Sequence, residues 1–226
     1  MRILVVAATH AEIAPLVAGL RQRPGEDSHI HRYTRGAREV DVLATGVGMV
    51  ATAARCSGAL ASGNYDVAFN FGICGSFDPA LPPASVVHVV TERLPELGAE
   101  DGDAFLTAEE LNLVGANQFP FDGARIVNVA RPVNAVLDRL PSVNGITVNT
   151  VHGSERTIAA IRARCAPQVE SMEGAAFLYS CLIRHLPCAE VRAVSNVVER
   201  RNRDAWKVHE AIAALGDTAL AILDQA

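Results

Sequence analysis

The chain has 226 residues, of which 50% are hydrophobic and 20% are charged, and its formal net charge is −5. This composition excludes a disordered chain, and the acidic balance lacks the basic footprint of a protein that binds nucleic acid or an anionic membrane. We therefore expect one folded domain over residues 1–226 that has a small-molecule partner.

The five cysteines are an odd number and include no C-x-x-C pair. The sequence therefore predicts neither a disulfide framework nor a zinc site. The apolar run at the start of the chain is too short for a signal peptide, and no other stretch approaches the roughly 20 apolar residues of a membrane span. We expect reduced thiols, a cytoplasmic location, and no metal or organic cofactor.

Strand-like apolar runs alternate with helical patterns along the chain. This alternation predicts an α/β fold: a central mixed, largely parallel sheet flanked by helices. In chain order, the first half is predicted to contain a strand at 3–8, a helix from Thr9, strands at 30–34 and 40–44, a helix at 50–61, and strands at 67–71 and 85–91. Glycine turns follow the strands that end near residues 44 and 71.

Between residues 94 and 123 the pattern weakens, and prolines and acids surround a short amphipathic piece at 108–114. A long surface excursion is expected there, of the kind that often has a functional role. The predicted elements that follow are a strand at 125–129, a helix from Pro132, a strand at 146–151, a helix at 154–164, a helix that opens at Val169 and runs to about 185, a strand at 190–194, and a helix at 204–223.

Ligands of α/β sheets bind outside the carboxyl ends of the strands, where helix N-termini and loop amides converge. The candidates at those ends are Glu12, Gly46-Val47-Gly48, Gly72-Ile73-Cys74-Gly75, Met172-Glu173 and Asn196. Neither glycine turn fits the dinucleotide-binding or P-loop pattern. Both turns do allow the backbone to approach a flat ligand closely.

Each polar candidate also has a purely structural interpretation. Thr9 and Glu12 fit the spacing of a helix capping box. An acid such as Glu173 is favourable in the first turn of a helix, which Ser171 could cap. Asn196 could be an ordinary turn residue.

Several segments become more informative when they are taken in order after Glu12. They are T-G-V-G at 45–48, N-F-G-I-C-G at 70–75, S-M-E-G-A at 171–175 and V-R-A-V-S-N at 191–196. In this order they resemble the nucleoside phosphorylase/nucleosidase superfamily across nearly the whole chain. Within it, residues 169–177 and 192–206 resemble the futalosine hydrolases, nucleosidases of an alternative menaquinone route.

The resemblance implies roles for three of the candidates. Glu12 would be the base that positions an attacking water at the ribose C1′. Met172 would pack under the sugar, and Glu173 would accept hydrogen bonds from the 2′ and 3′ hydroxyls. A carboxylate suits this last role because its two oxygens can hold two vicinal donors.

The resemblance also implies which residues line the ribose and the purine, namely Val47, Gly72, Cys74 and Gly75. Trp206 would close the site, although a tryptophan there could also be a core residue. Asn196 stands where adenine-specific nucleosidases carry the aspartic acid that assists the leaving group, and Ile73 replaces a small polar residue.

Three classes of function compete. A phosphorylase needs arginines and glycine amides aimed at one dianion, whereas the turn from Ala7 to Glu12 has neither arginine nor glycine, and Asn70-Phe71 lacks the arginine of many related phosphorylases. A purine-nucleoside binding protein needs a ribose clamp but no base, so Glu12 together with Glu173 favours catalysis. A methylthioadenosine/adenosylhomocysteine-type nucleosidase is a further alternative.

We therefore expect a nucleosidase that hydrolyses the N-glycosidic bond of a 6-oxopurine nucleoside with a 5′ substituent. The resemblance implies futalosine as its substrate, with hypoxanthine and dehypoxanthine futalosine as products. Members of the superfamily are usually oligomers, which implies at least a homodimer. An arginine should meet a carboxylate at the far end of the substrate. Arg200, Arg201 and Arg203 lie near the site in sequence, but such arginines are more often solvated surface residues, so they are not counted among the site residues.

Overall fold

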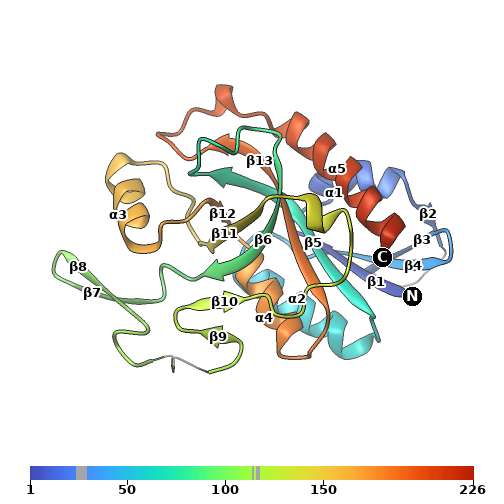
Figure 1. Ribbon diagram of the computed structural model, residues 1–226, viewed down its shortest axis with the longest axis horizontal. Coiled ribbons are helices and arrows are strands. Elements are labelled where there is room, and N and C mark those ends of the chain that lie inside the picture. Colours follow the sequence, from blue (N-terminus) through green and yellow to red (C-terminus); the bar gives the residue numbers. More distant parts are fainter. Residues whose placement is uncertain (24–29, 114, 116–117) are drawn as a thin grey trace.

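The computed structural model describes residues 1–23, 30–113, 115 and 118–226 of the chain (Figure 1). Its strands are β1 (Arg2–Ala7), β2 (Arg21–Gln22), β3 (Ile30–Arg35), β4 (Arg38–Ala44), β5 (Val67–Ser76), β6 (Val86–Arg93), β7 (Gly98–Asp101), β8 (Ala104–Thr107), β9 (Phe121–Asp122), β10 (Arg125–Val127), β11 (Ser142–Thr147), β12 (Val169–Ser171) and β13 (Cys188–Val197). Its α-helices are α1 (His10–Ala18), α2 (Met49–Ser62), α3 (Glu155–Cys165), α4 (Gly174–Leu182) and α5 (Val208–Gln225), and short 3-10 helices cover Leu137–Arg139 and Arg203–Ala205.

Eleven of the described strands form one mixed sheet in the order β2-β3-β4-β1-β5-β12-β11-β6-β10-β9, with β13 paired to both β5 and β6, and β7 and β8 form a separate two-stranded sheet. Strands β4, β1, β5 and β13 run parallel to one another, as do β12, β11 and β6. Because β12 also pairs with β5 and β13 with β6, the strands β5, β12, β11, β6 and β13 close into a ring. The predicted α/β architecture is confirmed.

Strand β1 shows why the sheet is covered on both faces. Its alternate residues Ile3 and Val5 pack in one core with the apolar faces of α1 and α5. Leu4 and Val6 point the other way and pack in a second core with α2 and α4. Because side chains of a strand alternate between faces, a wholly apolar strand needs helices on both sides. Figure 1 shows the two helix pairs on opposite sides of the sheet.

The helix predicted from Pro132 is wrong. That segment contains only the 3-10 helix Leu137–Arg139. The buried side chain of Asn134 accepts hydrogen bonds from the backbone N–H groups of Val136 (3.0 Å) and Leu137 (3.2 Å), and it donates to the Ile222 carbonyl (3.0 Å). Such bonds between a side chain and the backbone compete with a regular helix.

Two predicted strands have different limits in the structure. Strand β5 does not end at Phe71, because its pairing with β13 and β12 continues as far as Ser76. The segment 72–75 is therefore part of a strand and not a loop. The strand predicted at 146–151 lies at Ser142–Thr147, where it pairs with β6.

Two helix starts were also predicted too early. Residues Val169–Ser171 form strand β12, because they pair with β11 and β5, and helix α4 begins only at Gly174. The last helix begins at Val208 and not near Asp204, which belongs to the 3-10 helix before it. Both corrections place functional candidates just before a helix.

The expected excursion between residues 94 and 123 is present. It contains the β7–β8 hairpin, which extends to one side of the molecule (Figure 1). The amphipathic piece forms consecutive turns over 108–113, and Val114 lies outside the described residues. No helix in the described part of the chain has the length and apolarity needed to cross a membrane.

Candidate active site

A cavity of about 370 Å³ lies where the carboxyl ends of β1, β5 and β13 meet the segment before α4. Its size is that of a small-molecule site. Of the predicted site residues, those that line it are Glu12, Val47, Cys74, Gly75, Met172, Glu173, Asn196 and Trp206. Gly72 is the exception.

Glu12 belongs to a capping box and to the cavity at once. Its Oε2 accepts hydrogen bonds from the backbone N–H (2.9 Å) and the hydroxyl (3.0 Å) of Thr9, and the Glu12 N–H donates to that hydroxyl oxygen (3.4 Å). Its Oε1 accepts a third bond, from the Ile73 N–H at 3.1 Å. The carboxylate is therefore fixed at the cavity wall from both sides.

Glu173 precedes the first residue of α4 and is buried. Its Oε1 accepts a hydrogen bond from the Gly48 N–H at 3.0 Å, which ties the start of α4 to the start of α2. Gly48 has φ +96°, a conformation that favours glycine. The turn at 45–48 thus contributes a backbone amide that orients the Glu173 carboxylate.

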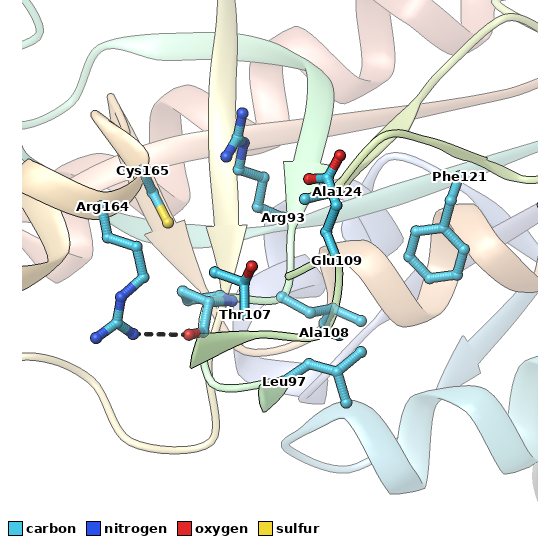
Figure 2. A pocket seen from close by; sticks show the side chains of 11 residues that line it. Arg93, Leu97, Thr107, Ala108, Glu109, Phe121, Ala124, Arg164 and Cys165 are labelled. Carbon is cyan, nitrogen blue, oxygen red and sulfur yellow. Dashed lines mark hydrogen bonds between the residues drawn. The ribbon is translucent and has the colours of Figure 1, made fainter. Parts of the chain in front are cut away.

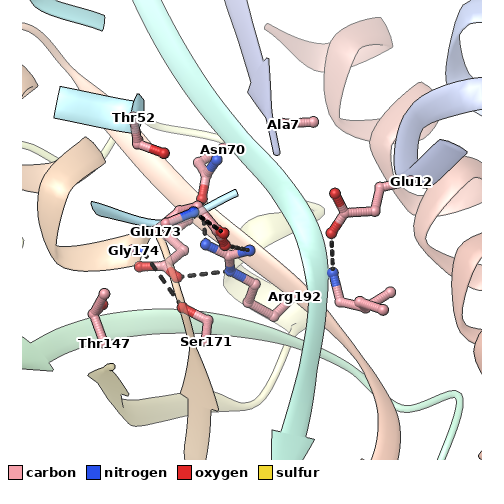
Figure 3. A network of polar contacts seen from close by, with 12 residues as sticks. Ala7, Glu12, Thr52, Asn70, Thr147, Ser171, Glu173, Gly174 and Arg192 are labelled. Carbon is pink, nitrogen blue, oxygen red and sulfur yellow. Dashed lines mark hydrogen bonds and ion pairs between the residues drawn. The ribbon is translucent and has the colours of Figure 1, made fainter. Parts of the chain in front are cut away.

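Arg192 of β13 lies behind Glu173 and is fully buried (Figure 3). Its Nε donates to Glu190 Oε1 at 2.8 Å, its Nη2 to Asn70 Oδ1 at 2.6 Å, and its Nη1 lies 3.4 Å from Glu173 Oε2. Burial lowers the pKa of this guanidinium, but the charges of Glu190 and Glu173 outweigh it and the net shift is upward. Arg192 is therefore a fixed cation that holds Glu173.

Gly72 lies against Arg192 and Glu12 at the cavity wall. A Cβ there would collide with the Arg192 guanidinium and would lie 3.0 Å from Glu12 Oε1. Gly72 is not among the residues that line the cavity, and its missing side chain leaves room for Arg192 beneath the cavity wall.

Asn196 follows an irregularity in β13, where the pairing register with β5 shifts between Val194 and Asn196. Its Oδ1 accepts a hydrogen bond from the Ser195 hydroxyl at 2.8 Å, and its Nδ2 donates to the Val197 carbonyl at 2.9 Å. One N–H of the amide thus remains beside the cavity.

A second carboxylate, Glu170 of β12, lines the same part of the cavity and is buried. Its Oε1 accepts a hydrogen bond from the His152 N–H at 3.1 Å, and its Oε2 lies 2.7 Å from His152 Nδ1. A carboxylate retains acceptor capacity beyond these two bonds. Glu170 and Asn196 together offer an acceptor and a donor.

The mouth of the cavity includes Trp206 and Arg201, whose guanidinium lies 5.3 Å from the centre of the Trp206 ring. Arg200 and Arg203 are not among the residues that line it.

Burial raises the pKa of the Cys74 thiol to about 12. Cys74 is therefore a neutral wall residue and not a nucleophile at neutral pH.

A smaller cavity, of about 50 Å³, lies among β6, the β7–β8 excursion and the end of α3 (Figure 2). Arg164 borders it and donates a hydrogen bond to the Pro95 carbonyl at 2.9 Å. This volume is too small for a drug-sized ligand. Among the described residues, no group of three or more His, Cys, Asp or Glu side chains is arranged to hold a metal ion.

Sequence reasoning did not single out Arg192, Asn70 or Glu170 as site residues. The sequence does contain a signal for them, which is a charged or amide side chain within a strand that is otherwise apolar. Such a side chain is buried only together with polar partners, so it predicts a buried polar contact. Arg192 and Glu190 alternate with Ala and Val residues in β13. That pattern indicates a polar network on one face of the strand.

The chain matches the family described as the Phosphorylase superfamily over residues 2–226. It is 33% identical to a futalosine hydrolase of Streptomyces coelicolor, with 96% of this chain and 93% of that protein covered. It is 31% identical to a futalosine hydrolase of Acidothermus cellulolyticus, with 94% and 89% covered.

Solved structures share the fold. Futalosine hydrolase of Helicobacter pylori superposes with a TM-score of 0.81 at 13% identity, covering 100% of this chain and 98% of that one. A 5′-methylthioadenosine/S-adenosylhomocysteine nucleosidase of Colwellia psychrerythraea, in complex with adenine, gives a TM-score of 0.79 at 21% identity, with 100% and 95% covered.

The contact between Gly72 and Arg192 predicts a stability difference between two glycine substitutions. Gly72→Ala should lower the free energy of unfolding by about 1–3 kcal/mol, because the new methyl group overpacks a buried guanidinium. Gly58→Ala is the matched control: its Cβ would meet nothing within 4 Å in α2, so it should stabilise by about 0.5–1 kcal/mol. Urea unfolding measures both, and equal stabilities would show that Arg192 can move aside.

Proposed function

Because the chain belongs to the phosphorylase superfamily and, within it, to the family of the futalosine hydrolases, we propose that it hydrolyses the N-glycosidic bond of futalosine. The products would be hypoxanthine and dehypoxanthine futalosine, the second of which belongs to a route to menaquinone. The observation that carries the proposal is the cavity wall, which combines the carboxylates of Glu12, Glu170 and Glu173 with the amide of Asn196.

In the proposed reaction Glu12 takes a proton from a water that attacks C1′ while the bond between C1′ and the purine breaks. The electron pair of that bond leaves with hypoxanthine, which takes up one proton from solvent as Glu12 gives its own back. Three hydrogen bonds from Thr9 and Ile73 hold the Glu12 carboxylate at the wall, so this carboxylate is oriented before substrate arrives. Such positioning removes part of the entropic cost of bringing water and base together. General-base assistance is typically worth about 10²- to 10⁴-fold.

Glu173 is proposed to accept hydrogen bonds from the 2′ and 3′ hydroxyls of the ribose. Gly48 and Arg192 hold its two oxygens from behind, and the side chain lines the cavity. Met172, which also lines the cavity, would pack against the apolar face of the sugar.

The purine pocket supports a 6-oxopurine. Hypoxanthine presents acceptors at N7 and O6 and a donor at N1, whereas adenine presents an amino donor at position 6 and an acceptor at N1. The free N–H of Asn196 suits the N7/O6 edge, and the Glu170 carboxylate suits the N1–H donor. Adenine would place its N1 lone pair against a buried carboxylate, an unpaired contact that costs about 1–3 kcal/mol.

Hydrolysis is favoured over phosphorolysis by the charge of the wall. Among the described residues that line the cavity, Arg201 is the only cation, and its guanidinium lies beside the Trp206 ring. Arg192 is fully buried and already bound by Glu190, Glu173 and Asn70. A phosphate dianion would meet carboxylates instead of the arginine cluster that it needs.

The proposal includes at least a homodimer. Helices α2 and α4 pack in one core, and they and the α4 end expose Val50, Tyr179 and Ile183 by 82%, 40% and 44%. A second copy of the chain that packs on these two helices would remove such apolar side chains from water, which is favourable.

The test is to incubate the protein with futalosine, with inosine and with methylthioadenosine, each with and without phosphate, and to separate the products by chromatography. The expected result is hypoxanthine from futalosine at a rate that phosphate does not change. Release that requires phosphate would indicate a phosphorylase, and faster release of adenine would indicate a methylthioadenosine-type nucleosidase. Binding without release would indicate a binding protein.

Glu12→Gln should lower turnover by at least about 10²-fold while the fold is retained, because the amide cannot take a proton from water. Thr9→Ala is the control that removes the cap and keeps the base. Thr9→Ala should lower the free energy of unfolding by about 1 kcal/mol, but it should reduce turnover much less than Glu12→Gln does. Comparable turnover losses in the two variants would show that Glu12 acts only as a cap.

Glu173→Gln should reduce kcat/KM for a riboside by about 10- to 100-fold, the value of hydrogen bonds to a charged group. The reduction should be smaller for the matching 2′-deoxyriboside, which has already lost one of the two contacts. Steady-state kinetics on both substrates measure the ratio. Equal reductions would remove Glu173 from the ribose site.

Asn196→Asp should shift the ratio of kcat/KM for hypoxanthine and adenine nucleosides with the same 5′ group toward adenine by at least about tenfold. A protonated aspartic acid can donate to N7 while its other oxygen accepts from the adenine amino group, but that oxygen repels O6 of hypoxanthine. Competition between the two nucleosides measures the ratio directly. A wild-type enzyme that prefers the adenine nucleoside would contradict the assignment to futalosine.

A further inference from the structure

Two buried glutamates that the proposed mechanism does not use lie behind Arg192. Glu92 of β6 and Glu190 of β13 are exposed by only 1% and 0%, and each carboxyl group acts electrostatically on the other. Isolated buried carboxylates are costly, so such a pair needs a physical explanation.

The hydrogen bonds around the pair leave one oxygen of each carboxyl group without a donor in the described part of the chain. Glu92 Oε2 accepts from the Thr147 hydroxyl at 2.9 Å, and Glu190 Oε1 accepts from Arg192 Nε at 2.8 Å. If both groups were ionised, Glu92 Oε1 and Glu190 Oε2 would be buried without a donor among the described residues. One proton between these two oxygens satisfies both.

The same contacts assign the proton to Glu92. The Thr147 hydroxyl donates to Glu92 Oε2 at 2.9 Å while its oxygen accepts a hydrogen bond from the Ala175 N–H at 2.7 Å. Glu92 Oε2 is therefore an acceptor, and the acid proton belongs on Oε1. Glu190 instead faces the Arg192 cation, which favours its ionised form.

The surrounding charges agree with this assignment. Burial and then the charge of Glu190 raise the pKa of Glu92 well above its usual range, and they outweigh the Thr147 hydrogen bond and the Arg192 charge, which lower it. The charged groups that face the pair are Arg192 on β13 and Glu173 at the start of α4. If Glu92 were ionised as well as Glu190, Arg192 would face three carboxylates, because Glu173 is the third.

Two glycines leave room for the pair. A Cβ at Gly145 of β11 would lie 2.5 Å from Glu92 Oε1, and a Cβ at Gly174 of α4 would collide with the Glu190 carboxyl. Neither strand β11 nor helix α4 could approach the carboxyls so closely with a larger residue. The pair is therefore enclosed on both sides by backbone.

We propose that Glu92 is a neutral carboxylic acid that donates to Glu190, and that this pair is a positioning device for the ribose clamp. Glu190 fixes Arg192, and Arg192 fixes Glu173. Through Thr147, Glu92 also holds the Ala175 amide in the first turn of α4, two residues after Glu173. The kinetic consequence rests on the proposed function, whereas the protonation does not.

Infrared spectroscopy tests the proton without any substrate. The spectrum of the wild-type protein at neutral pH should contain the C=O band of a protonated carboxyl group, and Glu92→Gln should lack it. Glu100→Gln, which removes an exposed carboxyl of β7, should retain the band. Identical spectra of wild type and Glu92→Gln would overturn the proposal, whatever the protein's activity.

The pH dependence of stability is an independent test. The folded state keeps its proton on Glu92 where the unfolded chain has lost it, so this group makes folding less favourable as pH rises above the unfolded pKa, about 4.3, toward the folded value. The Tm of Glu92→Gln minus the Tm of wild type should therefore increase from about pH 5 to about pH 8. A difference that does not vary with pH would overturn the proposal.

Kinetics test the positioning role. Glu92→Met leaves Glu190 Oε2 without a donor and should raise KM for the riboside by about tenfold or more, with a smaller change in kcat. Glu92→Gln donates to Glu190 and accepts from Thr147, and it should have a KM well below that of Glu92→Met. Equal KM values in the two variants would refute positioning, and an inactive wild type would instead refute the proposed function. If Glu92→Met does not fold, the same comparison is made with Glu92→Ser, whose hydroxyl is too short to reach Glu190.

Discussion

The site depends on one buried cation. Arg192 has no exposed surface, so each side of its guanidinium must meet an acceptor or the fold loses several kcal/mol. Its acceptors come from three elements: Asn70 on β5, Glu190 on β13 and Glu173 before α4. Because these three groups must all reach the Arg192 guanidinium, β13, its parallel neighbour β5 and the start of α4 are fixed in one arrangement. The Glu173 carboxylate is oriented as a consequence.

The sheet explains why these elements meet. Strands β1, β5 and β13 are parallel neighbours, so their carboxyl ends reach the same edge, and the ring formed with β6, β11 and β12 brings the start of α4 to that edge. The ring also encloses the polar pair Glu92 and Glu190 against backbone. These two carboxyl groups persist close to an apolar core because each of their oxygens has a partner once a single proton is counted.

Periodicity predicted most of the fold, and strand-end logic predicted most of the cavity wall. The failures have local causes. Asn134 binds its own backbone and prevents a helix that composition favours. The strand β12 has only the residues Val169–Ser171, too few for a periodic signal, and exists because β5 and β11 flank it. Gly72 and Arg192 form a pair that depends on contact between two strands, which no local pattern in either segment contains.

Glu12 shows that a structural and a chemical interpretation of one residue need not compete. The capping box fixes one carboxylate oxygen on Thr9, and the Ile73 amide fixes the other. A side chain held at both oxygens loses little entropy when a water binds beside it, and its charge needs no reorganisation at the moment of reaction. The bonds from Thr9 that stabilise the helix N-terminus thus also orient the carboxylate, and the Thr9 and Ile73 N–H groups keep it oriented even where the Thr9 hydroxyl is removed.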